Sequence, residues 1–192
     1  MLHCGFGSAA LRDGAAIAAA CVAGGRAAGC RVLLAGGLGG GLPRPYGAAC
    51  DGINGDGLDA CDADVFYMHE VPHDWLLPRC AVVLHHGGAG TCHAALHAGM
   101  PQVLCPLQYD QPFWAQRMNS LGVAPPPIDV DNFTADAVTS AVRRALATPI
   151  CSRAAAMANE LSGEADGASI AADFINAYVP AARDKTKQQA GA

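Results

Sequence analysis

The sequence of 192 residues is poor in charged and aromatic side chains, which make up 15% and 6% of it. Lysine and arginine are outnumbered by aspartate and glutamate, 12 against 17, so the formal net charge is −5. Proteins that bind nucleic acid through its phosphates need a basic surface, and no basic stretch is present. We therefore expect no nucleic-acid partner.

The sequence also lacks a stretch that is typical of a membrane span or a targeting segment. The alanine-rich stretch 14–25 is broken by glycines and follows no basic segment. It is also shorter than the about 20 apolar residues that cross a bilayer. Hydrophobic residues nevertheless make up 52% of the chain, enough for a buried core. We expect a cytoplasmic domain.

The cysteines do not have the arrangement of a disulfide framework. There are nine, an odd number, and they are scattered along the chain, several of them in apolar runs. Disulfide-rich domains are short and carry an even number of cysteines at regular spacings. We expect reduced, buried thiols.

Short apolar runs alternate with segments of helical character. The apolar runs predict strands within 1–8, at 31–35, 65–68 and 102–105, and from Val82 towards His86. Helices are predicted at 9–28, 112–121, 151–161 and 167–178, with one more that begins within 132–136. This alternation is typical of an α/β domain, so we predict a Rossmann-like parallel sheet flanked by helices over 1–180. Residues 181–192 are predicted to be a disordered tail.

A long insertion interrupts the alternation at about 38–62, where glycine, proline and aspartate are frequent and no periodicity is visible. Its aspartates suggest a calcium loop that would run from Asp51 to Asp62. An EF-hand loop, however, has glutamate at its twelfth position and a helix on each side, and both are missing here. We favour a solvated loop.

The most informative stretch is VVLHHGGAGT, from Val82 to Thr91. It predicts a strand, a glycine-rich turn and the start of a helix, the arrangement with which α/β proteins bind anions. Glycines at 87, 88 and 90 permit positive φ and close approach of a ligand. His86 lies at the carboxyl end of the strand, and Thr91 can cap the helix or donate to a phosphate. The alternative is a purely structural turn.

Three other patterns have competing interpretations. Cys92, His93 and His97 could bind zinc, but Cys92 points away from the helix face that the two histidines share, and no fourth ligand is evident. Asp110 could cap the helix that Pro112 begins. Trp75 is expected to be a core residue, as most aromatic side chains are.

The segment from Val71 to Met118 reads VPHDWLLPRCAVVLHHGGAGTCHAALHAGMPQVLCPLQYDQPFWAQRM. It closely resembles the donor-binding region of family 1 UDP-sugar-dependent glycosyltransferases of the two-domain GT-B type. The sterol 3-beta-glucosyltransferases and the antibiotic-type glycosyltransferases are the nearest. Gly-Phe-Gly-Ser near the start of the chain resembles the opening of the C-terminal half of these enzymes.

The resemblance implies a role for each motif. The diphosphate of the donor would be bound by two short segments, Gly7 and Ser8 in the first and His86, Gly88, Ala89, Gly90 and Thr91 in the second. Val71 and His73 would face the nucleoside, and Asp110 and Gln111 would bond the hydroxyls of the hexose. Two positions depart from the plant-type pattern. Ala94 replaces a glutamate that binds the ribose, and no tryptophan for stacking on uracil is found near Glu70.

The implied reaction is a metal-independent, inverting transfer of a hexose, by analogy glucose, from a UDP-sugar to a hydroxyl of a lipid such as a sterol. No cofactor is expected. In the family, an N-terminal domain binds the acceptor and carries the catalytic base, a histidine. We expect this chain to lack that domain, so it should bind the donor without turnover, and peripheral membrane contact would belong to a full-length enzyme. The alternatives are a fragment, a subunit that needs a separate acceptor-binding chain, and a non-catalytic nucleotide-sugar-binding module.

Overall fold

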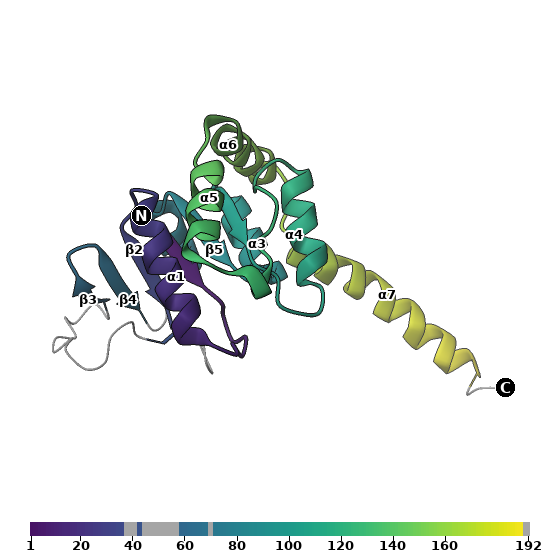
Figure 1. Ribbon diagram of the computed structural model, residues 1–192. Coiled ribbons are helices and arrows are strands. Elements are labelled where there is room, and N and C mark those ends of the chain that lie inside the picture. The colour runs from purple at the N-terminus through teal and green to yellow at the C-terminus, as the bar shows by residue number, and fades with distance from the viewer. Residues whose placement is uncertain (37–41, 44–57, 69–70, 190–192) are drawn as a thin grey trace. The chain divides into compact units, whose positions relative to one another are not determined.

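The computed structural model describes residues 1–36, 42–43, 58–68 and 71–189 (Figure 1). They fall into two compact units, Met1–Asn159 and Glu160–Ala192. The first unit contains the sheet and most helices. The second contains the long helix α7, Gly167–Gln189.

The sheet of the first unit has six strands in the order β3-β4-β2-β1-β5-β6. Five are parallel to one another, and β3 pairs antiparallel with β4 at one edge. The strands are β1 Leu2–Gly5, β2 Val32–Ala35, β3 Leu58–Asp62, β4 Val65–Met68, β5 Val82–His85 and β6 Gln102–Leu104. The predicted Rossmann-like parallel sheet is confirmed, with β1 between β2 and β5.

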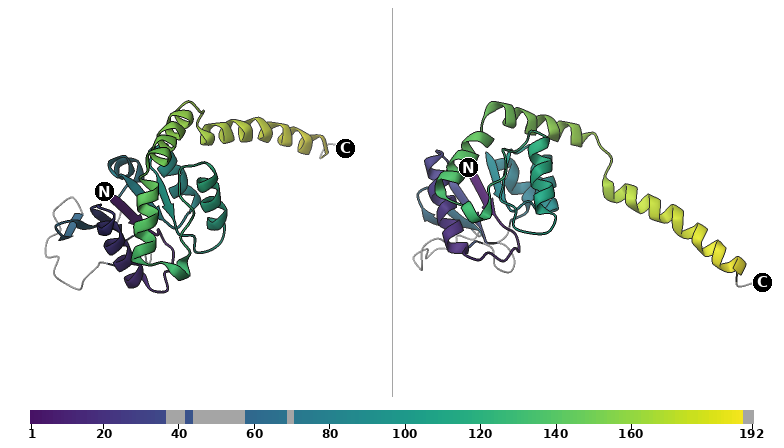
Figure 2. Two further views of the ribbon diagram at one scale, coloured as in Figure 1. Left: turned by 45° about the horizontal axis from the view of Figure 1, so that its top comes forward. Right: turned by 45° about the vertical axis from the view of Figure 1, so that its right-hand side comes forward.

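Helices cover both faces of the sheet (Figures 1 and 2). The larger core cluster joins one face to α1 and α5, and two smaller clusters join the other face to α2, the 3₁₀ turn η1 and α3. The helices are α1 Gly14–Ala27, α2 His73–Leu76, η1 Leu77–Arg79, α3 Ala89–His97, α4 Gln111–Ser120, η2 Val130–Asn132, α5 Ala135–Ala145 and α6 Thr148–Ser162. Alternate side chains of β2, β4 and β5 therefore enter opposite layers, as the pleat requires.

The small residues of α1 allow α5 to approach closely. A Cβ added to Gly24 would stand 2.6 Å from the Cβ of Val138. The hydroxyl of Thr139 also donates to the Gly24 carbonyl oxygen at 3.2 Å. α1 begins at Gly14, later than expected, because the Asp13 carboxylate accepts a hydrogen bond from the Ala16 N–H and caps the helix there.

Two predicted irregular segments contain regular structure. Leu58–Asp62, the end of the expected loop, is the strand β3, which pairs with β4. α7 continues to Gln189, into the segment 181–192 that the sequence predicts to be a tail. Residues 37–41 and 44–57, with most of the candidate calcium loop, lie outside the described residues.

In the second unit, the apolar face predicted for the last helix is exposed. Ile170 is 56% and Phe174 71% accessible, and Asp166 accepts hydrogen bonds at the start of the helix from the N–H and the hydroxyl of Ser169. Seven cysteines, at positions 4, 21, 30, 80, 92, 105 and 151, are free, and five of these seven are buried. Over the described residues, no helix combines the length and apolar character that a membrane crossing requires.

Candidate functional site

The candidate site lies at the carboxyl edge of the sheet, where the turns after β1 and β5 meet. Gly5 and His85 are register partners in these neighbouring strands, so the residues that follow them adjoin. A Cβ on Gly7 would lie 3.1 Å from Cε1 of His86, and Gly7 has a φ of 58°. Gly7 and Ser8 are exposed at this edge. The structure thus brings the two predicted diphosphate segments together.

The imidazole of His86 is held between two glycines. On one side is Gly7, and on the other a Cβ on Gly88 would stand 2.6 Å from Nε2. Partial burial lowers the pKa of His86, while a backbone hydrogen bond at Gly5 and the charge of Asp110 act in the opposite direction. The ring is therefore fixed at the edge of the sheet with Nε2 beside the start of α3.

The N-terminus of α3 has no side-chain cap. Gly88 is the N-cap residue and makes no side-chain hydrogen bond, and the first intrahelical bond runs from the Cys92 N–H to the Gly88 carbonyl oxygen. The N–H groups of Ala89, Gly90 and Thr91 therefore lack intrahelical acceptors and mark the positive end of the helix dipole. This is the geometry that binds a phosphate.

The three glycines of the turn differ in backbone conformation and in the space available for a side chain. Gly87 has a φ of 87°, which L side chains rarely adopt. Gly88 has negative φ and is required by the His86 ring. A Cβ on Gly90 would meet open space. Only Gly87 therefore supplies the positive φ that the sequence allowed at all three positions.

A buried network of hydrogen bonds stabilises the glycine-rich turn. The sequence did not predict it. Nδ1 of His85 accepts from the Gly87 N–H at 3.1 Å, which leaves Nε2 to donate to Oε1 of Gln102 at 3.0 Å. Nε2 of Gln102 donates in turn to the Cys92 carbonyl oxygen at 3.3 Å. Burial lowers the pKa of His85 to about 3, so the ring is neutral. The network connects β5, the turn, β6 and α3.

The two consecutive histidines, His85 and His86, are the sequence feature from which this network could have been predicted. Successive side chains of a strand point to opposite faces, so the second of two consecutive histidines at a strand end cannot share the environment of the first. His85 is fully buried and His86 is partly exposed. A polar residue buried in the next strand, such as Gln102, is then the expected partner.

The predicted nucleoside segment lies beyond β4. Val71 is half-buried and packs against a cluster that contains Leu33, while His73 is exposed at the start of α2. The ring centroid of His73 is 6.3 Å from that of His3, which is buried. His73 thus presents a polar side chain at the surface. Glu70 lies outside the described residues.

The prediction of a core role for Trp75 is wrong, because this side chain is 52% exposed. α2 is a single turn whose buried residue is Leu76. The guanidinium of Arg79 lies 4.5 Å from the Trp75 ring centroid and donates to the Trp75 carbonyl oxygen. The tryptophan therefore packs on the surface in a cation–π contact.

Asp110 and Gln111, where the loop after β6 meets α4, differ in exposure and in hydrogen-bond partners. Asp110 is exposed and occupies the N-cap position of α4, yet it makes no capping bond. Its Oδ2 instead accepts from the Trp114 Nε1–H at 2.8 Å. Gln111 is buried, and its Oε1 accepts from the N–H groups of Leu107 and Gln108 at 2.8 and 3.1 Å. The exposed side chain of Asp110 is thus bonded through one carboxylate oxygen to Trp114, while Gln111 holds the loop in shape.

The side chains of the zinc alternative do not converge. Cys92 is buried, whereas His93 and His97 are exposed. His93 packs edge-on against Trp114, with a centroid separation of 5.1 Å. Among the described residues, no group of three metal-ligating side chains lies close enough to hold an ion.

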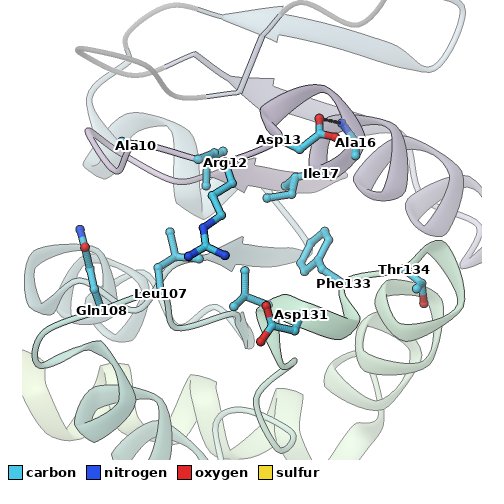
Figure 3. A pocket seen from close by; sticks show the side chains of 12 residues that line it. Ala10, Arg12, Asp13, Ala16, Ile17, Leu107, Gln108, Asp131, Phe133 and Thr134 are labelled. Atoms are coloured by element: carbon cyan, nitrogen blue, oxygen red, sulfur yellow. Dashed lines mark hydrogen bonds between the residues drawn. The ribbon is translucent and has the colours of Figure 1, made fainter.

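A cavity of about 640 Å³ adjoins the loop that precedes Asp110 (Figure 3). It lies between the starts of α1 and α5, and its lining is mixed, with both apolar and polar or charged side chains. The side chain of Arg12 extends into it above Leu107 (Figure 3). The lining includes Arg12, Ile17, Leu107, Gln108, Asp131 and Phe133.

Comparison with known proteins assigns the family. Residues 48–177 match the family described as erythromycin biosynthesis protein CIII-like, C-terminal domain. The chain belongs to this family of glycosyltransferase C-terminal domains. It is 40% identical over 119 residues to sterol 3-beta-glucosyltransferase UGT80A2 of Arabidopsis thaliana. The aligned region covers 62% of this chain and 18% of that protein. The chain is 37% identical over 178 residues to glycosyltransferase GtfE of Amycolatopsis orientalis, covering 93% and 39%.

Solved structures agree with this assignment. The glycotransferase of kitacinnamycin superposes with a TM-score of 0.69 at 25% identity, covering 91% of this chain and 42% of that one. The calicheamicin glycosyltransferase CalG4 has the same fold, with a TM-score of 0.67 at 21% identity, covering 94% and 43%. The GT-B resemblance of the sequence is therefore confirmed. The chain spans less than half the length of each of these relatives.

Proposed function

We propose that this chain is the donor-binding half of a hexosyltransferase that transfers glucose from UDP-glucose, with inversion, to the hydroxyl of a lipid such as a sterol. The observation that carries the proposal is the uncapped N-terminus of α3 beside the imidazole of His86. These groups lie at the carboxyl edge of a parallel sheet, where such folds bind nucleotides.

The chemistry of the reaction requires a site of this kind. When the glycosidic bond of a UDP-sugar breaks, UDP leaves and negative charge develops on its β-phosphate. Backbone N–H groups from Ala89 to Thr91, with His86, would donate to the phosphate oxygens as that charge grows. Because these donors are already fixed, they stabilise the charge without rearrangement. In this proposal the leaving group needs neither a metal nor another cofactor.

The remaining contacts follow the path of the donor away from the diphosphate. Gly7 and Ser8 would flank the diphosphate from the neighbouring turn. Val71 and His73 would contact the nucleoside, and Asp110 would accept hydrogen bonds from the hexose. A glycosyltransferase of the same fold, VinC, was solved in complex with dTDP, with a TM-score of 0.64, and this supports a pyrimidine nucleoside diphosphate as the ligand.

For Gln111, only one end of the side-chain amide would contact the hexose. Its oxygen already accepts two backbone hydrogen bonds. The amide nitrogen is the group that would donate to a hexose hydroxyl. Gln111 would therefore orient the loop with one end of its amide and contact the sugar with the other.

The acceptor and the catalytic base are proposed to come from a different part of the polypeptide or from a partner chain. The similarity to the sterol glucosyltransferase covers only 18% of that protein, so the remainder of its architecture has no counterpart in the match. The reaction would take place in the cytoplasm, with peripheral membrane contact in a full-length enzyme. A second candidate, which rests on the same partial coverage, is a non-catalytic nucleotide-sugar-binding subunit.

Calorimetry with the purified chain tests the donor site. We expect UDP and UDP-glucose to bind and uridine to bind at least about tenfold more weakly, because the diphosphate contacts are charge-assisted. Equal affinity for UDP and uridine would contradict the proposal. An assay of the chain with UDP-glucose and a sterol should show no turnover, and measurable turnover would show that the base lies within this chain.

A further inference from the structure

The indole of Trp114 makes a direct hydrogen bond to the carboxylate of Asp110. Its Nε1–H donates to Oδ2 at 2.8 Å, and the backbone N–H of Trp114 donates to the Asp110 carbonyl oxygen at 3.1 Å. The two residues are one helical turn apart, a spacing at which side chains share a face of α4. Both the backbone and the side chain of Asp110 are therefore fixed by the same residue.

Trp114 is itself held in place by its neighbours. The ring of His93, on α3, meets the indole edge-on with a centroid separation of 5.1 Å and an interplanar angle of 85°. Phe113 contacts it at 5.3 Å and 78°. Such edge-to-face pairs are favourable for aromatic rings. The indole therefore connects the helix of the candidate diphosphate site with the loop that carries Asp110.

The carboxylate of Asp110 needs such support because Gln111 holds the backbone of the loop but not this side chain. The side chain is exposed and makes no capping bond to α4. The preceding residue, Tyr109, has a φ of 57°, an unusual backbone conformation for a non-glycine residue. Without the indole, the carboxylate would be free to rotate about both side-chain torsions. With it, Oδ2 is occupied and Oδ1 is left to accept from a ligand.

We propose that Trp114 is a positioning residue for hexose recognition. Its N–H fixes one oxygen of Asp110 so that the other accepts a hydrogen bond from one hydroxyl of the donor sugar. This role rests on the proposed function. A carboxylate fixed in one orientation also distinguishes the epimers of a hexose, because the hydroxyl of the wrong epimer points away from Oδ1. Trp114 would thus set donor specificity without touching the sugar.

Two substitutions separate the N–H donor from the ring. Trp114→Phe keeps an aromatic ring against His93 and removes the donor. Trp114→Gln removes the ring and restores a donor, since glutamine and aspartate at this spacing form a hydrogen bond on a helix. Binding of UDP, UDP-glucose and its C4 epimer UDP-galactose is measured by calorimetry on the full chain, with Phe113→Leu as the control for aromatic packing.

We expect Trp114→Phe to weaken UDP-glucose binding about five- to tenfold, to leave UDP binding unchanged and to reduce the preference for UDP-glucose over UDP-galactose. Trp114→Gln should bind UDP-glucose more tightly than Trp114→Phe. The proposal is overturned if Trp114→Phe binds UDP-glucose like the native chain, if it loses UDP and UDP-glucose equally, or if Trp114→Gln is the weaker of the two. Failure of the native chain to bind UDP would instead overturn the proposed function itself.

Discussion

Nε2 of His86 lies so close to Gly88 that a Cβ at position 88 would stand 2.6 Å from it. The position of the imidazole thus depends on the absence of a side chain two residues later. His86 and the N-terminus of α3 form one unit because Gly88 is both the contact surface of the ring and the N-cap residue of the helix.

Gly88→Ala is expected to displace the His86 ring and to weaken UDP binding at least about tenfold, the usual cost of losing a hydrogen bond to a charged group. Gly167→Ala is the matched control, because a Cβ there would meet no atom within 4 Å and the residue lies in the second unit. Calorimetry with UDP compares the two variants. Native-like UDP affinity in Gly88→Ala would show that the position of His86 is not important for the diphosphate.

His86→Ala and Asp110→Ala should separate the two ends of the donor. Loss of the imidazole should weaken UDP and UDP-glucose alike, because it removes a diphosphate contact. Loss of the Asp110 carboxylate should weaken UDP-glucose alone, because UDP carries no hexose. Dissociation constants of both ligands for both variants provide the test. If Asp110→Ala loses as much UDP affinity as His86→Ala, Asp110 does not act on the hexose.

Gln102→Met should destabilise the chain by about 1–3 kcal/mol, since it leaves the buried Nε2–H of His85 without its acceptor. The side chains are similar in volume, so little of the effect would come from a cavity. Gln116→Met, on the exposed face of α4, should change the unfolding free energy by less than about 0.5 kcal/mol. Urea denaturation measures both. Equal stability of the two variants would mean that the His85 network contributes nothing.

The stability of the chain should fall on mild acidification because two buried histidines resist protonation. Burial lowers the pKa of His3 to about 4, with a smaller effect of His73, and that of His85 to about 3, both from 6.5. The unfolded chain then binds more protons than the folded one below pH 6.5. Each histidine should therefore cost up to about 1.4 kcal/mol per pH unit between pH 6.5 and about 4.

Denaturation in urea at a series of pH values measures this slope, and His3→Leu should reduce it by about half. An unchanged slope in that variant would show that His3 titrates alike in the folded and unfolded states. The Nδ1 of His3 is buried and makes no hydrogen bond, so leucine removes an unsatisfied polar atom as well as a titrating group.

The sheet and the central turn could be predicted because their signals are local. The apolar runs of β2, β4 and β5 are short and bounded by glycine or polar residues, which defines strands well. The strand β3 was missed because Leu58–Asp62 has the sequence Leu-Asp-Ala-Cys-Asp, without β-branched or aromatic residues, and is recognisable only through its pairing with β4. Strand formation there depends on a tertiary partner rather than on propensity.

Side-chain partners within the site were harder to predict than the elements that carry them. The fit of His86 between Gly7 and Gly88 depends on the adjacency of β1 and β5, which no local pattern contains. The exposure of Trp75 follows from the brevity of α2, whose buried residue is Leu76. The bond from Trp114 to Asp110 competes with helix capping, and propensity alone favours the cap.

The most direct test of the account is a crystal structure of the chain with UDP-glucose bound. The diphosphate should lie within hydrogen-bonding distance of His86 Nε2 and of the N–H groups of Ala89, Gly90 and Thr91, with the hexose against Asp110. A diphosphate bound elsewhere, for example in the cavity that contains Arg12, with the start of α3 left empty, would contradict it.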